Sequence, residues 1–398
     1  MNYNFDEIID RRNDPYSYSM KWSKNPMMAG MLGVDSINDE TIAIFTADMD
    51  FRCAQPIIES LHKVADHGIF GYSGHFCSED YFNAVINWFK RRHNWEFCKE
   101  DMVYSHGTVE ALKLSVQAFS EPGEGVIIQR PVYGPFTMVI ESSGRNLVNN
   151  QLIEGEDGFY TIDFEDLEAK AKDPNNKMML ICNPHNPVGR IWTKEEMQEV
   201  ARICRENDVI MVADEIHGDL VRKDAKFTPM ASVVDNSNLI TCTAVNKTFN
   251  LAGLGCTNLI IPNKDLRDKY SASAGFSTPS PFGIAAVISA YNEGEPWLEQ
   301  VKDYIDGNID YVLSFLKENM PKVKCRRPDG TYIMWMDFRE YGLTPEEIHK
   351  RIYCDANVLL EGGMMFDPDL GGGFERVCIP SPRSVINTAF QRISEQFK

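Results

Sequence analysis

Short, uninterrupted runs of apolar residues, separated by helical segments, constrain the fold of this chain more than any other feature of its sequence. Such runs are typical of parallel strands that are buried on both faces, because half-exposed strands alternate apolar and polar residues instead. The predicted strands cover residues 125–128, 177–182, 209–213 and 238–245. The pattern predicts an α/β fold with a large, mainly parallel sheet and helices on both of its faces.

The segments between these strands carry the signals of helices. Residues 107–119 place Leu112, Val116 and Phe119 on one helical face. Thr193 and Glu196 have the spacing of a capping box, which opens the next predicted helix. Because helices connect the parallel strands, we expect ligands to bind beyond the carboxyl ends of the strands.

The C-terminal part of the chain has a different pattern. Residues 283–320 are largely helical, and residues 331–338 alternate like a strand with one exposed face. The glycine-rich segments 362–363 and 371–373 are predicted loops. We therefore predict a large domain (51–285) and a small C-terminal α+β domain (286–398). An N-terminal segment (1–50) is predicted to contribute to the small domain and to the substrate site.

Charge and cysteine usage exclude several classes of partner. The formal net charge of −18 argues against nucleic acid and anionic membranes, which both need a basic face. The first ten residues lack the features of a signal peptide, and no apolar run approaches the roughly 18 residues of a membrane helix. We therefore expect a cytoplasmic protein. The ten cysteines lack metal-binding spacing, so we predict reduced thiols and no metal site.

Chemically useful side chains follow three successive predicted strands. Residues 183–189, Asn-Pro-His-Asn-Pro-Val-Gly, follow the second strand, Asp214 and His217 follow the third, and Lys247 follows the fourth. Each has an ordinary alternative explanation: a turn, a helix cap, a packed histidine or a solvated loop lysine. Their conjunction at one edge of a parallel sheet instead indicates a binding site.

A pyridine aldehyde that carries a phosphate would suit this set of groups. Lys247 would form a Schiff base with the aldehyde and later act as the base that removes a substrate Cα proton. Asp214 would keep the pyridine nitrogen protonated, which makes the ring an electron sink. Tyr133 would stack on the ring, and Asn186 and His217 would hydrogen-bond the ring oxygen. The phosphate would bind the free amides at the helix start, residues 107–109.

The sequence resembles the pyridoxal-phosphate (PLP) enzymes of the aspartate aminotransferase fold, the class I/II aminotransferase family, over nearly the whole chain. The nearest branch is the group similar to cystathionine β-lyases (C–S lyases). The motifs that carry the resemblance are residues 21–22, 47–51, 71–73, 131–135, 183–190, 214–217 and 247–253. The resemblance implies PLP-dependent transferase fold type I, with the cofactor bound by the large domain.

The resemblance also implies roles that the residues alone do not. Tyr72 would reach the phosphate of a neighbouring subunit, which implies a homodimer with shared active sites. Arg383 would hold the substrate α-carboxylate as a planar bidentate cation, with Asn186 beside it. The predicted cofactor-binding residues are Gly107, Thr108, Val109, Tyr133, Asn183, Asn186, Asp214, His217, Lys247 and Tyr72.

The chain departs from the family pattern around the phosphate. Many members have hydroxyl residues three and one positions before the lysine and a basic residue eight positions after it. Here those positions hold Ala244, Asn246 and Gly255. The phosphate would therefore depend on the amides of residues 107–109 and on Tyr72, and the contributions of Thr243 and Asn246 stay open.

Two reactions begin with the same removal of a Cα proton. Motifs 47–51 and 183–186 resemble the lyase branch and favour β-elimination from cystathionine or related S-substituted cysteines, which releases thiol, pyruvate and ammonia. Transamination of an L-amino acid is the alternative, and a PLP-binding regulatory protein that acts through a protein partner is a lesser one. The sequence lacks the glycine-rich motifs of NAD- and ATP-dependent enzymes and the serine-hydrolase elbow.

Overall fold

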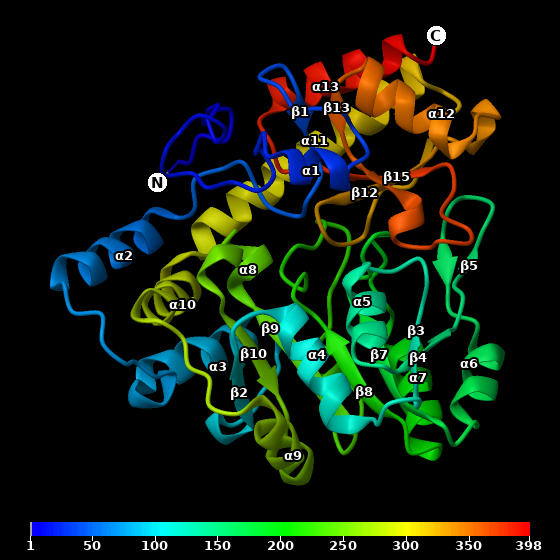
Figure 1. The fold of residues 1–398 in the computed structure, drawn as a ribbon. Coiled ribbons are helices and arrows are strands. Elements are labelled where there is room, and N and C mark those ends of the chain that lie inside the picture. Colours follow the sequence, from blue (N-terminus) through cyan, green and yellow to red (C-terminus); the bar gives the residue numbers. More distant parts are fainter. Residues whose placement is uncertain (1) are drawn as a thin grey trace.

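A seven-stranded sheet forms the centre of the larger part of the molecule in the computed structural model, which describes residues 2–398 (Figure 1). The strands, in spatial order, are β2 (Met102–Ser105), β10 (Thr257–Ile260), β9 (Leu239–Ala244), β8 (Ile210–Asp214), β7 (Asn176–Cys182), β3 (Gly125–Ile128) and β4 (Asn146–Asn149). Only β10 runs antiparallel to its neighbours among these strands. The predicted mainly parallel sheet is confirmed.

Both faces of the sheet are buried in separate apolar cores. In β7, Met179 and Ile181 belong to one core, whereas Met178 and Leu180 belong to the other. One core is covered by α4 (Thr108–Phe119), α5 (Pro135–Ser142) and α9 (Lys264–Ala274). The other is covered by α2 (Gln55–His67), α3 (Glu79–His93), α6 (Phe164–Ala171), α7 (Lys194–Glu206) and α10 (Pro281–Glu293). Two covered faces explain why the strands are apolar without alternation.

The predicted elements agree with the structure to within about one residue at most ends. The helix predicted at 107–119 is α4, and the capping box of Thr193 and Glu196 opens α7 with both reciprocal hydrogen bonds formed. These agreements arise because burial periodicity and end caps are local properties of the sequence.

The C-terminal part contains a four-stranded antiparallel sheet, with the strands in the order β11 (Lys324–Cys325), β12 (Ile333–Asp337), β15 (Phe374–Cys378) and β14 (Glu361–Gly362). Its helices are α11 (Glu295–Asn319), α12 (Pro345–His349), a π-helix (Lys350–Asp355) and α13 (Arg383–Glu395). β1 (Ile42–Ala43) pairs in parallel with β13 (Val358–Leu359), so the N-terminal segment lies against this C-terminal part (Figure 1). The exact domain boundaries stay a prediction.

Two local predictions in this part were wrong. β12 is not exposed on one face, because its first four residues are all buried. One reason is that Trp335 of β12 faces the larger part of the molecule, where its Nε1 donates a hydrogen bond to the Tyr160 hydroxyl at 3.3 Å. Gly362 is not wholly in a loop, because it pairs with Glu375 as the end of β14.

The remaining elements are short. They are α1 (Pro26–Met31), α8 (Val245–Thr248), a two-stranded hairpin of β5 (Ile153–Glu154) and β6 (Tyr160–Thr161), and six 3₁₀ turns, at His75–Cys77, Lys99–Asp101, Met230–Ser232, Ala252–Leu254, Arg339–Tyr341 and Gly363–Met365. Within residues 2–398, none of the helices combines the length and apolar character that crossing a membrane requires.

Candidate active site

Three neighbouring strands bring the predicted polar groups to one edge of the large sheet. β7, β8 and β9 are adjacent and parallel, and their last paired residues, Cys182, Asp214 and Cys242, lie in register. The loop after β7 carries Asn186, and α8 follows β9 directly and carries Lys247. The structure therefore brings together the amide, acid and amine that the sequence places after separate strands.

Lys247 lies at the junction of the large sheet with the N-terminal segment. Its Nζ donates a hydrogen bond to the carbonyl oxygen of Ala47 at 2.8 Å, and the hydroxyl of Tyr332 donates to the same oxygen at 2.8 Å. Burial, and then the nearby positive charge of Arg376, lower the pKa of Lys247. A lowered pKa favours the neutral amine, which is the nucleophilic and basic form.

Asp214 is a buried carboxylate that forms no ion pair within 4.0 Å among residues 2–398. Burial raises its pKa to about 6, although the backbone N–H of Ile216 and the charge of Lys247 act in the opposite direction. A protonated pyridine nitrogen would supply the positive charge that this carboxylate lacks. The environment of Asp214 thus fits the predicted cofactor.

His217 and Asn186 keep hydrogen-bonding atoms available beside Asp214. Nδ1 of His217 is buried and has no partner within residues 2–398, and burial keeps the pKa of this ring well below its usual value. Asn186 uses its Oδ1 to accept a hydrogen bond from Arg376, while its Nδ2 has no acceptor in the described chain. Tyr133 lies next to them, because its backbone N–H donates to the Asn186 carbonyl at 3.0 Å. The residues predicted to bind the ring therefore lie close together.

Arg376 is the arginine of this site, and the sequence analysis missed it. Its Nη1 donates to Asn186 Oδ1 at 3.0 Å, and its Nε donates to Glu361 Oε2 at 2.9 Å. Its guanidinium also lies over the ring of Phe366. The sequence signal was weak, because residues 374–378 of β15 read Phe-Glu-Arg-Val-Cys and hold two adjacent charges. Only the structure shows that Arg376 is 2 % exposed, and a charge so deeply buried needs a specific reason.

Arg383 does not lie in this site, so the prediction that it holds the substrate carboxylate needs correction. Its Nε donates to Asn308 Oδ1 at 2.6 Å, and its guanidinium lies over the ring of Tyr311. Asn308 and Tyr311 both belong to α11. Arg383 is the first residue of α13, and it reaches these two side chains because α13 packs on α11. We therefore propose that Arg376, not Arg383, binds the substrate α-carboxylate.

The side chain of Asn183 is engaged by other parts of the chain, and its predicted contact with the cofactor stays a prediction. Its Oδ1 accepts a hydrogen bond from the backbone N–H of Trp192 at 3.1 Å, and its Nδ2 lies 3.5 Å from Met197 Sδ. The side chain therefore closes the loop 183–192 against α7. Asn186, three residues later, is the asparagine that faces Arg376.

The start of α4 has the free donors expected of a phosphate site. The amides of Gly107, Thr108 and Val109 have no acceptor within residues 2–398, and a helix start favours an anion. Asn246 Oδ1 is buried without a partner, whereas the Thr243 hydroxyl donates to the Asn258 carbonyl at 3.2 Å. Thr243 is thus already engaged with β10.

The departure at Gly255 has a structural explanation. Its φ is +60°, and a Cβ at this position would lie 2.6 Å from Cε1 of His106. The imidazole of His106, the residue directly before Gly107, occupies the space that a side chain at position 255 would need. The imidazole beside the helix start therefore leaves no room for a side chain at position 255.

The N-terminal segment is fastened to the site by buried charges. Lys21, which is 1 % exposed, donates to Asp50 at 2.8 Å and lies 3.5 Å from Asp48. Trp22 and Ser381 also donate to Asp50, at 2.8 and 2.6 Å, and Arg11 pairs with both carboxylates. These contacts hold the backbone next to Ala47, which positions Lys247. They give motifs 21–22 and 47–51 a physical role.

The pKa shifts of this cluster show which interactions stabilise it. Burial alone would raise the pKa of Asp50, but Lys21 and then Arg11 lower it overall. Because the folded-state pKa is lowered, the stability that Asp50 contributes is complete above its ordinary pKa and is lost as the pH falls through the lowered value. The contribution of Asp50 therefore weakens in acid. Burial would lower the pKa of Lys21, but Asp50 and Asp48 raise it overall, so the contribution of Lys21 weakens in alkali instead.

Replacing Lys21 by methionine is expected to lower the free energy of unfolding by about 3–5 kcal/mol, because Asp50 would lose a buried partner while the side-chain length is kept. Urea unfolding followed by circular dichroism measures this change. Lys24→Met is the matched control, since Lys24 pairs with Asp39 at the exposed surface. Equal unfolding midpoints for the two variants would show that the buried cluster does not stabilise the N-terminal segment.

Comparisons with known proteins agree with this geometry. The family model of aminotransferase class I and II matches residues 46–393. The chain is 39% identical to Cystathionine beta-lyase PatB of Bacillus subtilis over 395 residues, and the matched region covers 98% of each chain. Among solved structures, cystalysin from Treponema denticola, which contains a pyridoxal 5'-phosphate cofactor, is similar with a TM-score of 0.93 and 35% identity over 100% of this chain and 99% of that one. The PLP-bound C–S lyase from Staphylococcus hominis is similar with a TM-score of 0.91 and 33% identity, and the match covers 100% of this chain and 98% of that one.

Proposed function

The chain belongs to the aminotransferase class I and II family, and on that premise we propose that it is a PLP-dependent carbon–sulfur β-lyase. Its substrates would be cystathionine or related S-substituted L-cysteines, and its products a thiol, pyruvate and ammonia. The observation that carries the lyase assignment is the 39% identity, over 98% of both chains, to a protein named as a cystathionine β-lyase. The two similar PLP-containing structures support the cofactor.

The residues around Asp214 would hold the cofactor. When bound, PLP supplies an electron sink that makes the Cα proton of an amino acid removable. Asp214 would face the pyridine nitrogen, Tyr133 the ring, and Nδ2 of Asn186 with His217 the ring oxygen. The amides of residues 107–109 would bind the phosphate. Each of these groups has an unused donor, an unpaired charge or a ring surface at this edge of the sheet.

Arg376 would bind and orient the substrate through its α-carboxylate. A guanidinium presents several donors in one plane, and Glu361 and Asn186 fix that plane from two sides. Glu361 also balances the charge of the buried cation. Although burial by itself would lower the pKa of Arg376, Glu361 raises it overall. The residue therefore stays charged at all working pH values.

Lys247 would move the Cα proton at its Nζ. A hydrogen bond to Ala47 holds the amine at the site, and its lowered pKa favours the neutral form that accepts a proton. Burial is the main reason that the pKa of the Tyr133 hydroxyl is raised, so this group keeps its own proton beside the site. The site would thus combine Lys247, which accepts a proton, with Tyr133, which keeps its own.

Incubating the holoenzyme with L-cystathionine and no keto acid tests the reaction. One water is consumed per turnover, and homocysteine, pyruvate and ammonia are expected in equal amounts. A thiol reagent measures homocysteine, and lactate dehydrogenase with NADH measures pyruvate. Products that form only after a 2-oxo acid is added would show an aminotransferase instead.

We also propose a homodimer that completes the site. Tyr72 is fully exposed in the single chain, together with a group of large apolar side chains on and near the connection between α2 and α3. These are Ile69, Phe70, Phe76 and Phe276. Exposed apolar groups of this size favour burial against a partner, and a second copy would bring Tyr72 towards a neighbouring phosphate site. Sedimentation of the holoenzyme measures its mass.

A further inference from the structure

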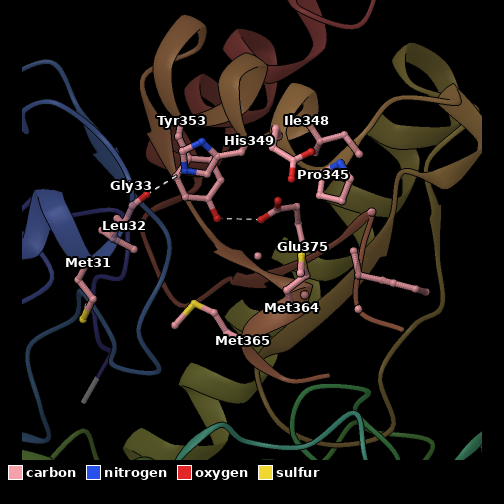
Figure 2. Close-up of a pocket in the computed structure, with 16 residues that line it drawn as sticks. Met31, Leu32, Gly33, Pro345, Ile348, His349, Tyr353, Met364, Met365 and Glu375 are labelled. Carbon is pink, nitrogen blue, oxygen red and sulfur yellow. Dashed lines mark hydrogen bonds between the residues drawn. The ribbon is translucent and has the colours of Figure 1, made fainter. Parts of the chain in front are cut away.

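A cavity of about 380 Å³ lies between the C-terminal part and the end of α1, on the face of β15 opposite to Arg376. Figure 2 shows the residues that line it. Neighbouring residues of a strand point to opposite faces of its sheet. Arg376 points towards Asn186, so Glu375 points the other way, into this cavity. The remaining walls come from the end of α1, from α12 and the π-helix, and from the loop after β14.

The walls of the cavity are mainly apolar and adaptable. Met31, Met364 and Met365 lie at its rim and are each about half exposed, while Ile348 and Phe374 are buried behind them. Methionine side chains are flexible and polarizable, so they fit apolar ligands of varied shape. The cavity therefore suits a small apolar body.

One buried polar group is directed into this apolar space. Glu375 is 4 % exposed, and its Oε2 accepts a hydrogen bond from the Tyr353 hydroxyl at 2.9 Å. Its Oε1 has no hydrogen-bond partner within residues 2–398. Tyr353 is itself fixed, because it stacks on His349 at 4.2 Å, and His349 Nε2 is bonded to the Leu32 carbonyl at 2.9 Å. Figure 2 shows Glu375 between Tyr353 and the methionines.

The ionisable groups around the cavity favour a positively charged ligand. Its lining includes the carboxyl groups of Glu375 and Glu346 but no lysine or arginine. Burial, and then Glu361 on the far side of the sheet, raise the pKa of Glu375 to about 8, against the effect of the Tyr353 hydrogen bond. The raised pKa favours the protonated carboxyl group at neutral pH, and a cation beside Oε1 would favour the charged form.

We propose that this cavity is a second binding site of the protein, for a small apolar molecule that carries one amine. The ammonium group would donate to Oε1 of Glu375, and the apolar body would lie among the methionines. Binding of the ammonium ion leaves its own proton in place and releases the carboxyl proton of Glu375 to water, so an ion pair replaces a neutral acid.

The cavity also adjoins the loop that supports the active site. In this loop, the carbonyl of Phe366 accepts a hydrogen bond from the Val132 backbone N–H at 3.1 Å. A Cβ at Gly134 would lie 2.9 Å from the Met365 carbonyl oxygen. A ligand against Met364 and Met365 therefore contacts the segment that packs on the Tyr133 turn.

Calorimetric titration of the PLP-loaded enzyme with N,N-dimethylhexylamine tests the proposal. A tertiary amine cannot condense with an aldehyde, so its binding does not report on Lys247 or on the lyase reaction. At about pH 6.5, in two buffers of different ionisation enthalpy, we expect saturable binding with about one proton released per ligand. Glu375→Gln should weaken binding by about 10- to 100-fold, the range for a hydrogen bond to a charged group, and abolish the proton release.

Three controls separate this site from general adsorption. Glu346→Gln at the exposed rim should change the affinity by less than about twofold. Met364→Trp, which fills the cavity from its rim, should weaken binding without touching Glu375. Hexanoate should bind much more weakly than the amine, because a carboxylate cannot form an ion pair with Glu375. The proposal is overturned if the amine does not bind at millimolar concentration, if Glu375→Gln binds it equally well, or if hexanoate binds as tightly.

Discussion

Lys247→Ala is expected to reduce pyruvate release from cystathionine by at least roughly 10³-fold, the effect of removing a group that moves a proton in the reaction. The expected loss is large because the same amine would also bind the cofactor aldehyde. Its hydrogen bond to Ala47 holds the amine in place, and its lowered pKa increases the fraction in the neutral, reactive form. The measurement is kcat with saturating substrate.

Two observations control for an unfolding effect. Lys264→Ala removes an exposed lysine from α9 and should keep full activity. Adding methylamine to Lys247→Ala should restore part of the activity, since a small free amine can enter the space of the lost side chain and accept the proton. Borohydride reduction of the holoenzyme should label Lys247, and a label on another lysine would refute its assignment.

Arg376→Gln is expected to lower kcat/KM by about 100-fold or more, mainly through a higher KM. Two hydrogen bonds from a charged group to a carboxylate would be lost, each with a contribution of about 1.5–3 kcal/mol. Because this change also leaves Glu361 without its buried partner, Arg376→Gln/Glu361→Gln is the necessary companion. The double variant restores the charge balance, and we expect its kcat/KM to stay low.

Arg383→Gln is the matched comparison, because it removes the arginine that the resemblance selected. Arg383 contacts Asn308 and Tyr311 of α11, so its loss should change kcat/KM by less than about threefold. If Arg383→Gln lowers kcat/KM as strongly as Arg376→Gln, the assignment of Arg376 to the substrate carboxylate is wrong. Both variants should be measured at the same pH with the same cystathionine concentrations.

Arg376 and Glu375 show how one strand can serve two sites. The pleat of β15 directs Arg376 to the proposed PLP side and Glu375 to the apolar cavity. Arg376 is paired with the carboxylate of Glu361, and Glu375 accepts a hydrogen bond from the Tyr353 hydroxyl. The register of β14 places Glu361 opposite Arg376 and Gly362 opposite Glu375. A single residue of slippage would exchange the two faces, so the pairing of β14 with β15 is required for both sites.

The sequence alone predicted the large sheet and the residues at its edge. Continuous apolar strands, the capping box at Thr193 and the order of Asp214 and Lys247 after successive strands are local patterns, and parallel pairing places such strand ends at one edge. The same patterns could not show the depth of burial of β12, since that depends on segments far away in the chain.

Only the tertiary structure decided which arginine and which asparagine belong to the site. Arg376 and Arg383 both lie near the C-terminus, and their partners, Asn186 and Asn308, are 190 and 75 residues away in the chain. Periodicity predicts which face of an element is buried, but a hydrogen bond needs two side chains at a set distance and angle. The sequence therefore determined the sheet and its reactive edge, and the packing of the C-terminal part on that edge determined the partners.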